Sequence, residues 1–292
     1  MRQRLIGAAV LVPVVVIAFL LGDPWLSIGI ALLGAAVAYE TAQLVKRAGL
    51  PANTVLAVAA PPLAVLAFTL TDTAFSWAER LLIPAVLAVW LILCSIVAFR
   101  QRDPGDGFRA WVGTLFSSLY PSLIASTAAI LHLNSGQFAM LQNPVLAGLD
   151  PGRIWLLILV LTVWTLDSGA YLAGKYHSRG RFMNHISPNK TWSGAVGGAA
   201  AATAICALLF WLTGLQPLFG LILGLVIGVV AQAGDLAESM IKRAAGAKDS
   251  GSLIPGHGGF LDRVDSFLFA APVMYLVLIL YGLRPGGIWI AD

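Results

Sequence analysis

The residues best suited to chemistry lie in one stretch, SMIKRAAGAKDSGSLIPGHGGFLDRVD, at 239–265 between two long apolar segments. It combines bases, carboxylates, a histidine and three glycines: Lys242, Arg243, Lys248, Asp249, Gly256, His257, Gly258, Gly259, Asp262, Arg263 and Asp265. Carboxylates with phosphate oxygens form the usual shell of Mg²⁺, and glycines let a backbone approach a ligand closely. The stretch therefore predicts phosphoryl or nucleotidyl chemistry at a membrane surface. The plainer alternative is a basic loop whose acids only balance its bases.

Further carboxylates lie inside apolar segments, where ionisable groups cost about 2.5 to 3.5 kcal/mol on insertion scales and often mark function. Helical spacing puts one polar set on a common face: Asp235, Glu238 or Ser239, and Lys242. A second set, also four residues apart, consists of Asp167, Tyr171 and Lys175. The two stripes predict a polar funnel open to the cytoplasm. The alternative is that each carboxylate only pairs with a base from another helix.

The loop GKYHSRGRFMNHISPNKTWSG at 174–194 is a second candidate for anion binding. Ser187 and Pro188 favour a turn, and Thr191 is a good cap for the helix that follows. A helix N-terminus with Lys190 beside it suits an anion. The alternative is that these bases only obey the charge bias of membrane loops.

Composition places these residues in a membrane protein. Apolar residues make up 59% of the 292-residue chain and charged residues only 11%, whereas soluble domains carry about a quarter charged residues. Backbone groups in hydrocarbon must be satisfied internally, so the apolar segments are expected to be helices. We expect an all-α polytopic membrane protein with about nine of them, at 5–22, 25–45, 52–70, 80–99, 108–131, 153–175, 192–213, 216–241 and 265–283.

Two of these segments contain prolines that should bend them. Pro61 and Pro62 make 52–70 either a kinked span or a re-entrant segment, and Pro121 should bend 108–131. Glycines four residues apart in 192–213 and 216–241 predict close packing between helices, not catalysis. They are Gly194 and Gly198, and Gly220, Gly224 and Gly228.

Basic residues predict the orientation. With the N-terminus in the cytoplasm, all but three of the 18 lysines and arginines lie on the cytoplasmic side, the exceptions being Arg80, Arg153 and Arg284. The net charge of +4 therefore reflects topology and not nucleic-acid binding. We expect the inner (cytoplasmic) membrane, with the active site facing the cytoplasm. The predicted division is an N-terminal scaffold at 1–131, a non-cytoplasmic loop at 132–152, and a catalytic region at 153–292 with cytoplasmic loops 176–191 and 242–264.

The 239–265 stretch resembles the signature of the phosphatidate cytidylyltransferase (CDP-diacylglycerol synthase) family. The pattern Ser-x-x-apolar-Lys-Arg, Lys-Asp, His-Gly-Gly and Asp-Arg-apolar-Asp is complete, and residues 167–171 and 187–191 also look like family motifs. The resemblance is strong over 153–284. The chain departs from the family at Asn189, where a lysine is common, and at Ser193, where a glutamate is common. The chain therefore lacks the lysine and the glutamate that the family pattern often has in this loop.

The resemblance implies that CTP and phosphatidate give CDP-diacylglycerol and pyrophosphate with Mg²⁺ in phospholipid biosynthesis, and it leaves the use of a second cation open. On this basis the expected metal ligands are Asp235, Asp262, Asp249 and Asp265. Lys242 joins Asp235, Asp262 and Asp249 as a catalytic residue. Substrate contacts are expected from Asp167, Ser187, Lys190, Ser239, Arg243, Lys248, His257, Gly258, Gly259 and Arg263.

Two alternatives stay open from the sequence. A related CTP-dependent lipid enzyme, such as a polyprenol kinase or an archaeal-type lipid cytidylyltransferase, would use similar residues. A secondary transporter would use Asp167 and Asp235 as ion sites, although no paired halves are visible. The glycine-rich segments permit a homodimer without requiring one.

Overall fold

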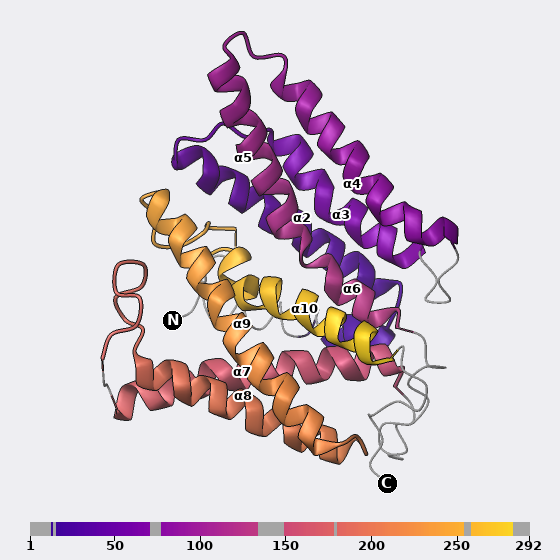
Figure 1. Ribbon diagram of the computed structural model, residues 1–292, viewed down its shortest axis with the longest axis vertical. Helices are drawn as coiled ribbons and strands as arrows, with labels where there is room; N and C mark the ends of the chain where they lie inside the picture. The colour runs from indigo at the N-terminus through magenta and orange to yellow at the C-terminus, as the bar shows by residue number, and fades with distance from the viewer. Residues whose placement is uncertain are drawn as a thin grey trace. The chain divides into compact units, whose positions relative to one another are not determined.

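The computed structural model describes Pro13 and residues 16–70, 77–133, 149–177, 180–253 and 258–282, and in these ranges the chain is helical with one isolated β-bridge (Figure 1). The helices are α2 (Trp25–Arg47), α3 (Thr54–Leu70), α4 (Trp77–Ala98), α5 (Pro104–Ser122), α6 (Ala125–Leu131), α7 (Pro151–Tyr176), α8 (Trp192–Leu212), α9 (Pro217–Ala244) and α10 (Leu261–Gly282).

Among the described residues, seven helical segments are long and apolar enough to cross a membrane, counting α5 and α6 as one. The expected all-α polytopic membrane protein is therefore confirmed. Large apolar side chains are exposed along these helices, including Leu81, Leu87 and Trp211, as a lipid-facing surface requires. Most of the expected first segment lies outside the described residues, so the count of nine and the orientation stay predictions.

Of the two segments that contain prolines, one forms a continuous helix and the other is broken into two helices. Helix α3 continues through Pro61 and Pro62 but has only 17 residues, short of the roughly 20 that a span needs. The segment at 108–131 is broken after Pro121 into α5 and α6. There, Leu123 N donates to Tyr120 O and Ile124 N to Pro121 O, which are tighter bonds than those of an α-helix. The bend expected at Pro121 is thus confirmed.

The chain forms two compact units, 1–132 with 240–264 and 133–239 with 265–292. In the first unit, α2 and α3 pack together and both contact α5. The unit boundary crosses α9 after residue 239 and enters α10 after residue 264. The predicted division into scaffold, loop and catalytic region stays a prediction.

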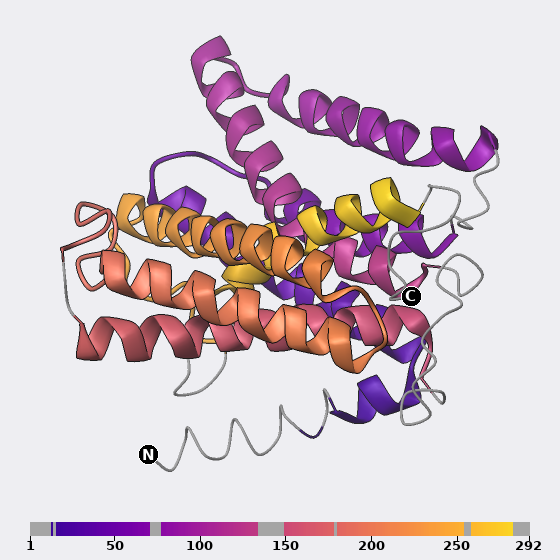
Figure 2. The ribbon, with the colours of Figure 1, turned by 60° about the horizontal axis from the view of Figure 1, so that its bottom comes forward.

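In the second unit, α7 and α8 lie side by side (Figures 1 and 2). Small residues make this close packing possible: a Cβ on Gly197 would lie 2.2 Å from Ala173 Cβ, and one on Gly198 would lie 3.0 Å from Ala170 Cβ. On α9, a Cβ on Gly224 would lie 2.7 Å from Cys206 Cβ of α8. The prediction that these glycines serve helix packing is confirmed.

Candidate active site

A cluster of three carboxylates forms where α9 and α10 meet within the second unit. Asp235 and Glu238 come from α9 and Asp265 from α10, and one oxygen of each lies within 4.8 Å of the others. Glu238 is buried, whereas Asp235 and Asp265 are partly exposed. Gly234 allows the approach, because a Cβ there would lie 2.6 Å from the carbonyl oxygen of Asp265. The helices therefore bring hard oxygen ligands together at a single point.

One ammonium group accompanies this cluster. Lys190 Nζ lies 2.8 Å from Asp235 Oδ2, and Ser239 Oγ lies 3.4 Å from Asp235 Oδ1. Asp167 of α7 is within electrostatic range of both Asp235 and Lys190. Clustered carboxylate oxygens are the kind of ligand that hard divalent cations prefer.

The loop before α8 fixes the position of Lys190. Phe182 N donates to Lys190 O at 2.8 Å, and the Phe182 ring packs edge-on against Trp192. Thr191 Oγ1 accepts from Gly194 N at 3.0 Å, which confirms the predicted cap. Ser193, where the family often has a glutamate, lies with its hydroxyl 3.1 Å from that of Thr191. The substitution thus places a short hydroxyl at the helix start in place of a carboxylate.

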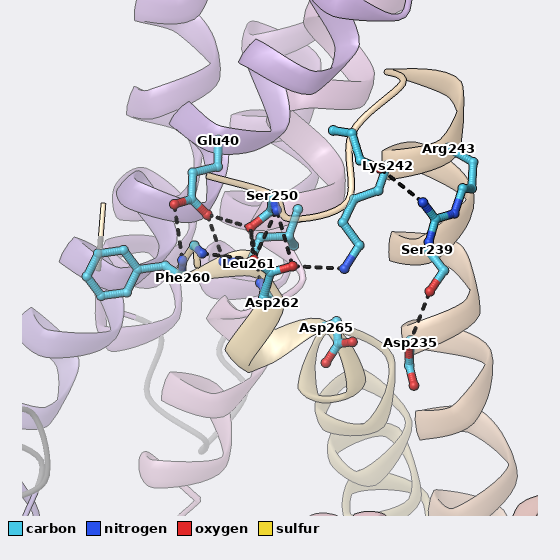
Figure 3. A network of polar contacts seen from close by, with 12 residues as sticks. Glu40, Asp235, Ser239, Lys242, Arg243, Ser250, Phe260, Leu261, Asp262 and Asp265 are labelled. Atoms are coloured by element: carbon cyan, nitrogen blue, oxygen red, sulfur yellow. Dashed lines mark hydrogen bonds and ion pairs between the residues drawn. The ribbon is translucent and has the colours of Figure 1, made fainter. Parts of the chain in front are cut away.

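Asp262 is the centre of a second polar group, in the first unit (Figure 3). Its Oδ1 accepts from Lys242 Nζ at 2.8 Å, and its Oδ2 accepts from Gly259 N at 2.8 Å and Ser250 N at 3.0 Å. Both side chains of the Lys242–Asp262 ion pair are largely buried, at 13% and 14% exposed. The signature aspartate therefore holds a signature lysine and the loop that precedes α10.

Glu40 of α2 also belongs to this second group. It is 2% exposed. Its carboxylate accepts hydrogen bonds from Phe260 N at 3.1 Å and from Leu261 N at 2.9 Å, and it lies 3.1 Å from Ser250 Oγ. Sequence reasoning missed Glu40, although a lone acid inside an apolar segment was the available signal. Glu238 was also missing from the expected metal ligands, although the helical spacing placed it on the same face as Asp235.

The remaining predicted residues lie closer to the surface. Arg243, Lys248, Asp249 and Arg263 are exposed, and Arg243 donates to Ala247 O at 3.3 Å. Ser187 is partly buried. Its backbone oxygen accepts a hydrogen bond from Lys190 N at 3.4 Å, which forms the expected turn. Gly258 has φ +81°, a conformation that favours glycine.

His257 lies outside the described residues. Asp235 and Asp262 belong to different compact units, so their shared metal stays a prediction, as do the roles of Asp249 and the substrate-binding residues.

Comparison with known proteins identifies the family. A sequence model of the cytidylyltransferase family matches residues 2–281. Proteins named phosphatidate cytidylyltransferase are similar over part of the chain: those of Brucella suis biovar 1 (strain 1330), 46% identical over 141 residues, and of Bacillus subtilis (strain 168), 41% identical over 133 residues. These alignments cover 48% and 44% of this chain, and 52% and 49% of the two relatives. The chain thus spans about half the length of the curated relatives it matches. Because the family match extends over nearly the whole sequence, the chain belongs to the cytidylyltransferase family.

Proposed function

We propose that the protein transfers a cytidylyl group from CTP to phosphatidate, giving CDP-diacylglycerol and pyrophosphate. The observation that carries the proposal is the convergence of Asp235, Glu238 and Asp265 beside Lys190 in a member of the cytidylyltransferase family. The names of the similar proteins favour phosphatidate as the acceptor. The substrates are accordingly a nucleotide from solution and a lipid from the membrane.

The carboxylate cluster fits a divalent cation. Its donors are all oxygens, and they come from two adjacent helices. Mg²⁺ prefers such ligands and usually completes its shell with water and substrate phosphates. A bound cation would neutralise part of the charge of the triphosphate. We assign this site to Asp235, Glu238 and Asp265, and keep Asp262 and Asp249 as candidate ligands of a second cation.

The reaction needs positioning and charge stabilisation more than a strong base. A phosphate oxygen of phosphatidate forms a bond to the α-phosphorus of CTP, and the bond from that phosphorus to the oxygen bridging toward the β-phosphate breaks. The electron pair leaves with pyrophosphate. Because both reactants are anions, cationic side chains must offset their repulsion. We assign that task to Lys242, Arg243, Lys248 and Arg263 for the nucleotide, with Lys190 and Ser187 for either substrate.

The remaining assignments concern the surroundings of the reacting groups. Asp167 and Ser239 line the polar region next to Asp235. Gly258, Gly259 and His257 shape the loop near the triphosphate. The bias of basic residues supports a site that faces the cytoplasm from the inner membrane. A secondary transporter is not favoured, because family membership points to nucleotidyl transfer.

The test is incubation of the purified protein with CTP, phosphatidate and Mg²⁺, with both products measured. Pyrophosphate and CDP-diacylglycerol should appear in equal amounts and only when the metal is present. Release of CDP with a phosphorylated lipid would indicate a kinase instead. Asp262→Asn should still bind lipid yet lose turnover. Asp150→Asn should keep its turnover, because Asp150 is an exposed aspartate that pairs with Arg153. Near-normal turnover of Asp262→Asn would remove Asp262 from the site.

A further inference from the structure

Glu40 caps the start of α10 from a helix that lies more than 200 residues earlier in the chain. A helix leaves its first backbone N–H groups without partners inside the helix. At α10, Phe260 N and Leu261 N donate to the two oxygens of Glu40, and Asp262 N donates to Ser250 Oγ at 3.3 Å. The partial positive charge of a helix N-terminus also stabilises an anion there. This explains how a carboxylate that is almost fully buried is tolerated in α2.

A chain of contacts leads from Glu40 to the signature lysine (Figure 3). Ser250 Oγ lies 3.1 Å from Glu40 Oε2 and 2.9 Å from Asp262 Oδ2. Its single proton can be donated to only one of them at full strength, so the hydroxyl couples the two carboxylates. Asp262 then accepts from Lys242 Nζ. All these residues belong to the first compact unit.

Two glycines of the loop leave room for the Glu40 carboxylate. A Cβ on Gly259 would lie 2.4 Å from Glu40 Oε2 and 2.1 Å from Ser250 Oγ, and a Cβ on Gly251 would lie 2.5 Å from Glu40 Oε1. Real Cβ atoms do not approach other atoms that closely. The close approach that sequence reasoning expected of a ligand is made here by a side chain of the protein itself.

We propose that Glu40 is a positioning residue: it holds Ser250 and the backbone at 260–261, where α10 begins, and through Ser250 it fixes the Lys242–Asp262 pair. Its effect on activity rests on the proposed function, in which Lys242 is assigned to the charge of the nucleotide and Asp262 to a second cation. Misplacement of such groups by about 1 Å can cost about 100-fold in rate. Glu40 itself touches no reacting atom in this assignment.

The test compares Glu40→Gln with Asp103→Asn. In Glu40→Gln the new side-chain amide would turn an N–H group toward backbone or hydroxyl donors. The isosteric change therefore breaks hydrogen bonds between residue 40 and the start of α10, which together we call the clamp. Asp103 is a matched control, because its carboxylate caps α5 in the same unit by accepting from Asp106 N at 2.9 Å. Two readouts are needed: hydrogen exchange of the amides at 259–262, and steady-state kinetics of pyrophosphate release.

For Glu40→Gln we expect at least about tenfold faster exchange at 259–262 and at least about a tenfold lower kcat, with KM for CTP changed by less than about threefold. Combining it with Ser250→Ala should cost little more than Glu40→Gln alone, because both act through Asp262. Asp103→Asn should change neither readout more than about twofold. Unchanged exchange, or an unchanged kcat in an active protein, would overturn the proposal.

Hydrogen exchange at 259–262 does not depend on enzymatic activity, so it tests the role of Glu40 separately from the proposed function. If the wild-type protein forms no CDP-diacylglycerol, the function has failed, yet faster exchange in Glu40→Gln would still support the clamp and unchanged exchange would still refute it. If Glu40→Gln does not fold, Gly251→Ala takes its place, because its Cβ would displace the Glu40 carboxylate while keeping every charge.

Discussion

Lys190 Nζ lies 2.8 Å from Asp235 Oδ2, so an ion pair joins the loop before α8 to a carboxylate of α9. The lysine is 23% exposed and the aspartate 37% exposed, which leaves room for a phosphate or a metal ligand to share the contact. The pair brings a positive charge next to a group of three carboxylates. The charge balance of the cluster, and not just its ligand types, therefore makes it sensitive to substitution.

Removing the lysine should tighten metal binding while slowing the reaction. In Lys190→Met the Asp235 carboxylate loses an ammonium that lies 2.8 Å away, and unit charges about 4 Å apart interact by about 4 kcal/mol at an effective dielectric constant of about 20. We expect the half-saturating Mg²⁺ concentration to fall at least about threefold and kcat to fall at least about tenfold in the pyrophosphate assay. Lys46→Met, at an exposed lysine that contacts Thr54 Oγ1, is the control. A rise in the Mg²⁺ requirement would contradict this account of the pair.

Glu238→Gln should weaken metal binding, whereas Lys190→Met should tighten it. The change removes one negative charge from three clustered carboxylates, so the Mg²⁺ half-saturation should rise at least about tenfold. Without metal, the loss of like-charge repulsion should raise the free energy of unfolding by about 1 kcal/mol.

Thermal unfolding with and without Mg²⁺ measures the effect of Glu238→Gln independently of activity. The variant should have the higher midpoint in a chelator and the smaller metal-induced increase. Asp150→Asn should match the wild type in both conditions. An equal metal-induced increase in the variant would exclude Glu238 as a ligand.

The sequence predicted the features that depend on residues close together in the chain, and it did not predict contacts between residues far apart. Local signals worked well: apolar length placed the described helices, and the Thr191 cap and the break after Pro121 follow from short-range chemistry. The i, i+3 spacing of Asp235 and Glu238 also placed two of the clustered carboxylates on one helix face.

The contacts of Glu40 could not be predicted because they join residues 210 to 221 positions apart. Helical periodicity says which residues share a face but not which distant helix that face meets. The loop glycines were linked to an external ligand for the same reason: a glycine indicates close approach without identifying the group that approaches. A buried acid in an apolar helix needs donors, and that requirement was the only local sign of the clamp.

Gly251→Ala should weaken the loop through steric displacement alone. Its Cβ would lie 2.5 Å from Glu40 Oε1, so the carboxylate or the loop must shift. We expect at least about a tenfold loss of kcat and a lower unfolding midpoint. Gly29→Ala is the matched control, because nothing lies within 4 Å of its Cβ position in α2 and alanine favours a helix by about 0.5 to 1 kcal/mol. Equal activities of the two variants would show that the close approach is not needed.

Gly224→Ala should destabilise the second unit without touching a site residue. The new Cβ would lie 2.7 Å from Cys206 Cβ and 2.8 Å from Ala202 O, so α8 and α9 must separate or shift. Overpacking of this kind costs about 1 to 3 kcal/mol, and the loss should appear as a lower midpoint of thermal unfolding in detergent. Leu225→Ala changes the neighbouring residue, which is 52% exposed, and should leave the midpoint nearly unchanged. If Gly224→Ala were as stable as Leu225→Ala, the close contact of these helices would not contribute to stability, and the glycine spacing would need another explanation.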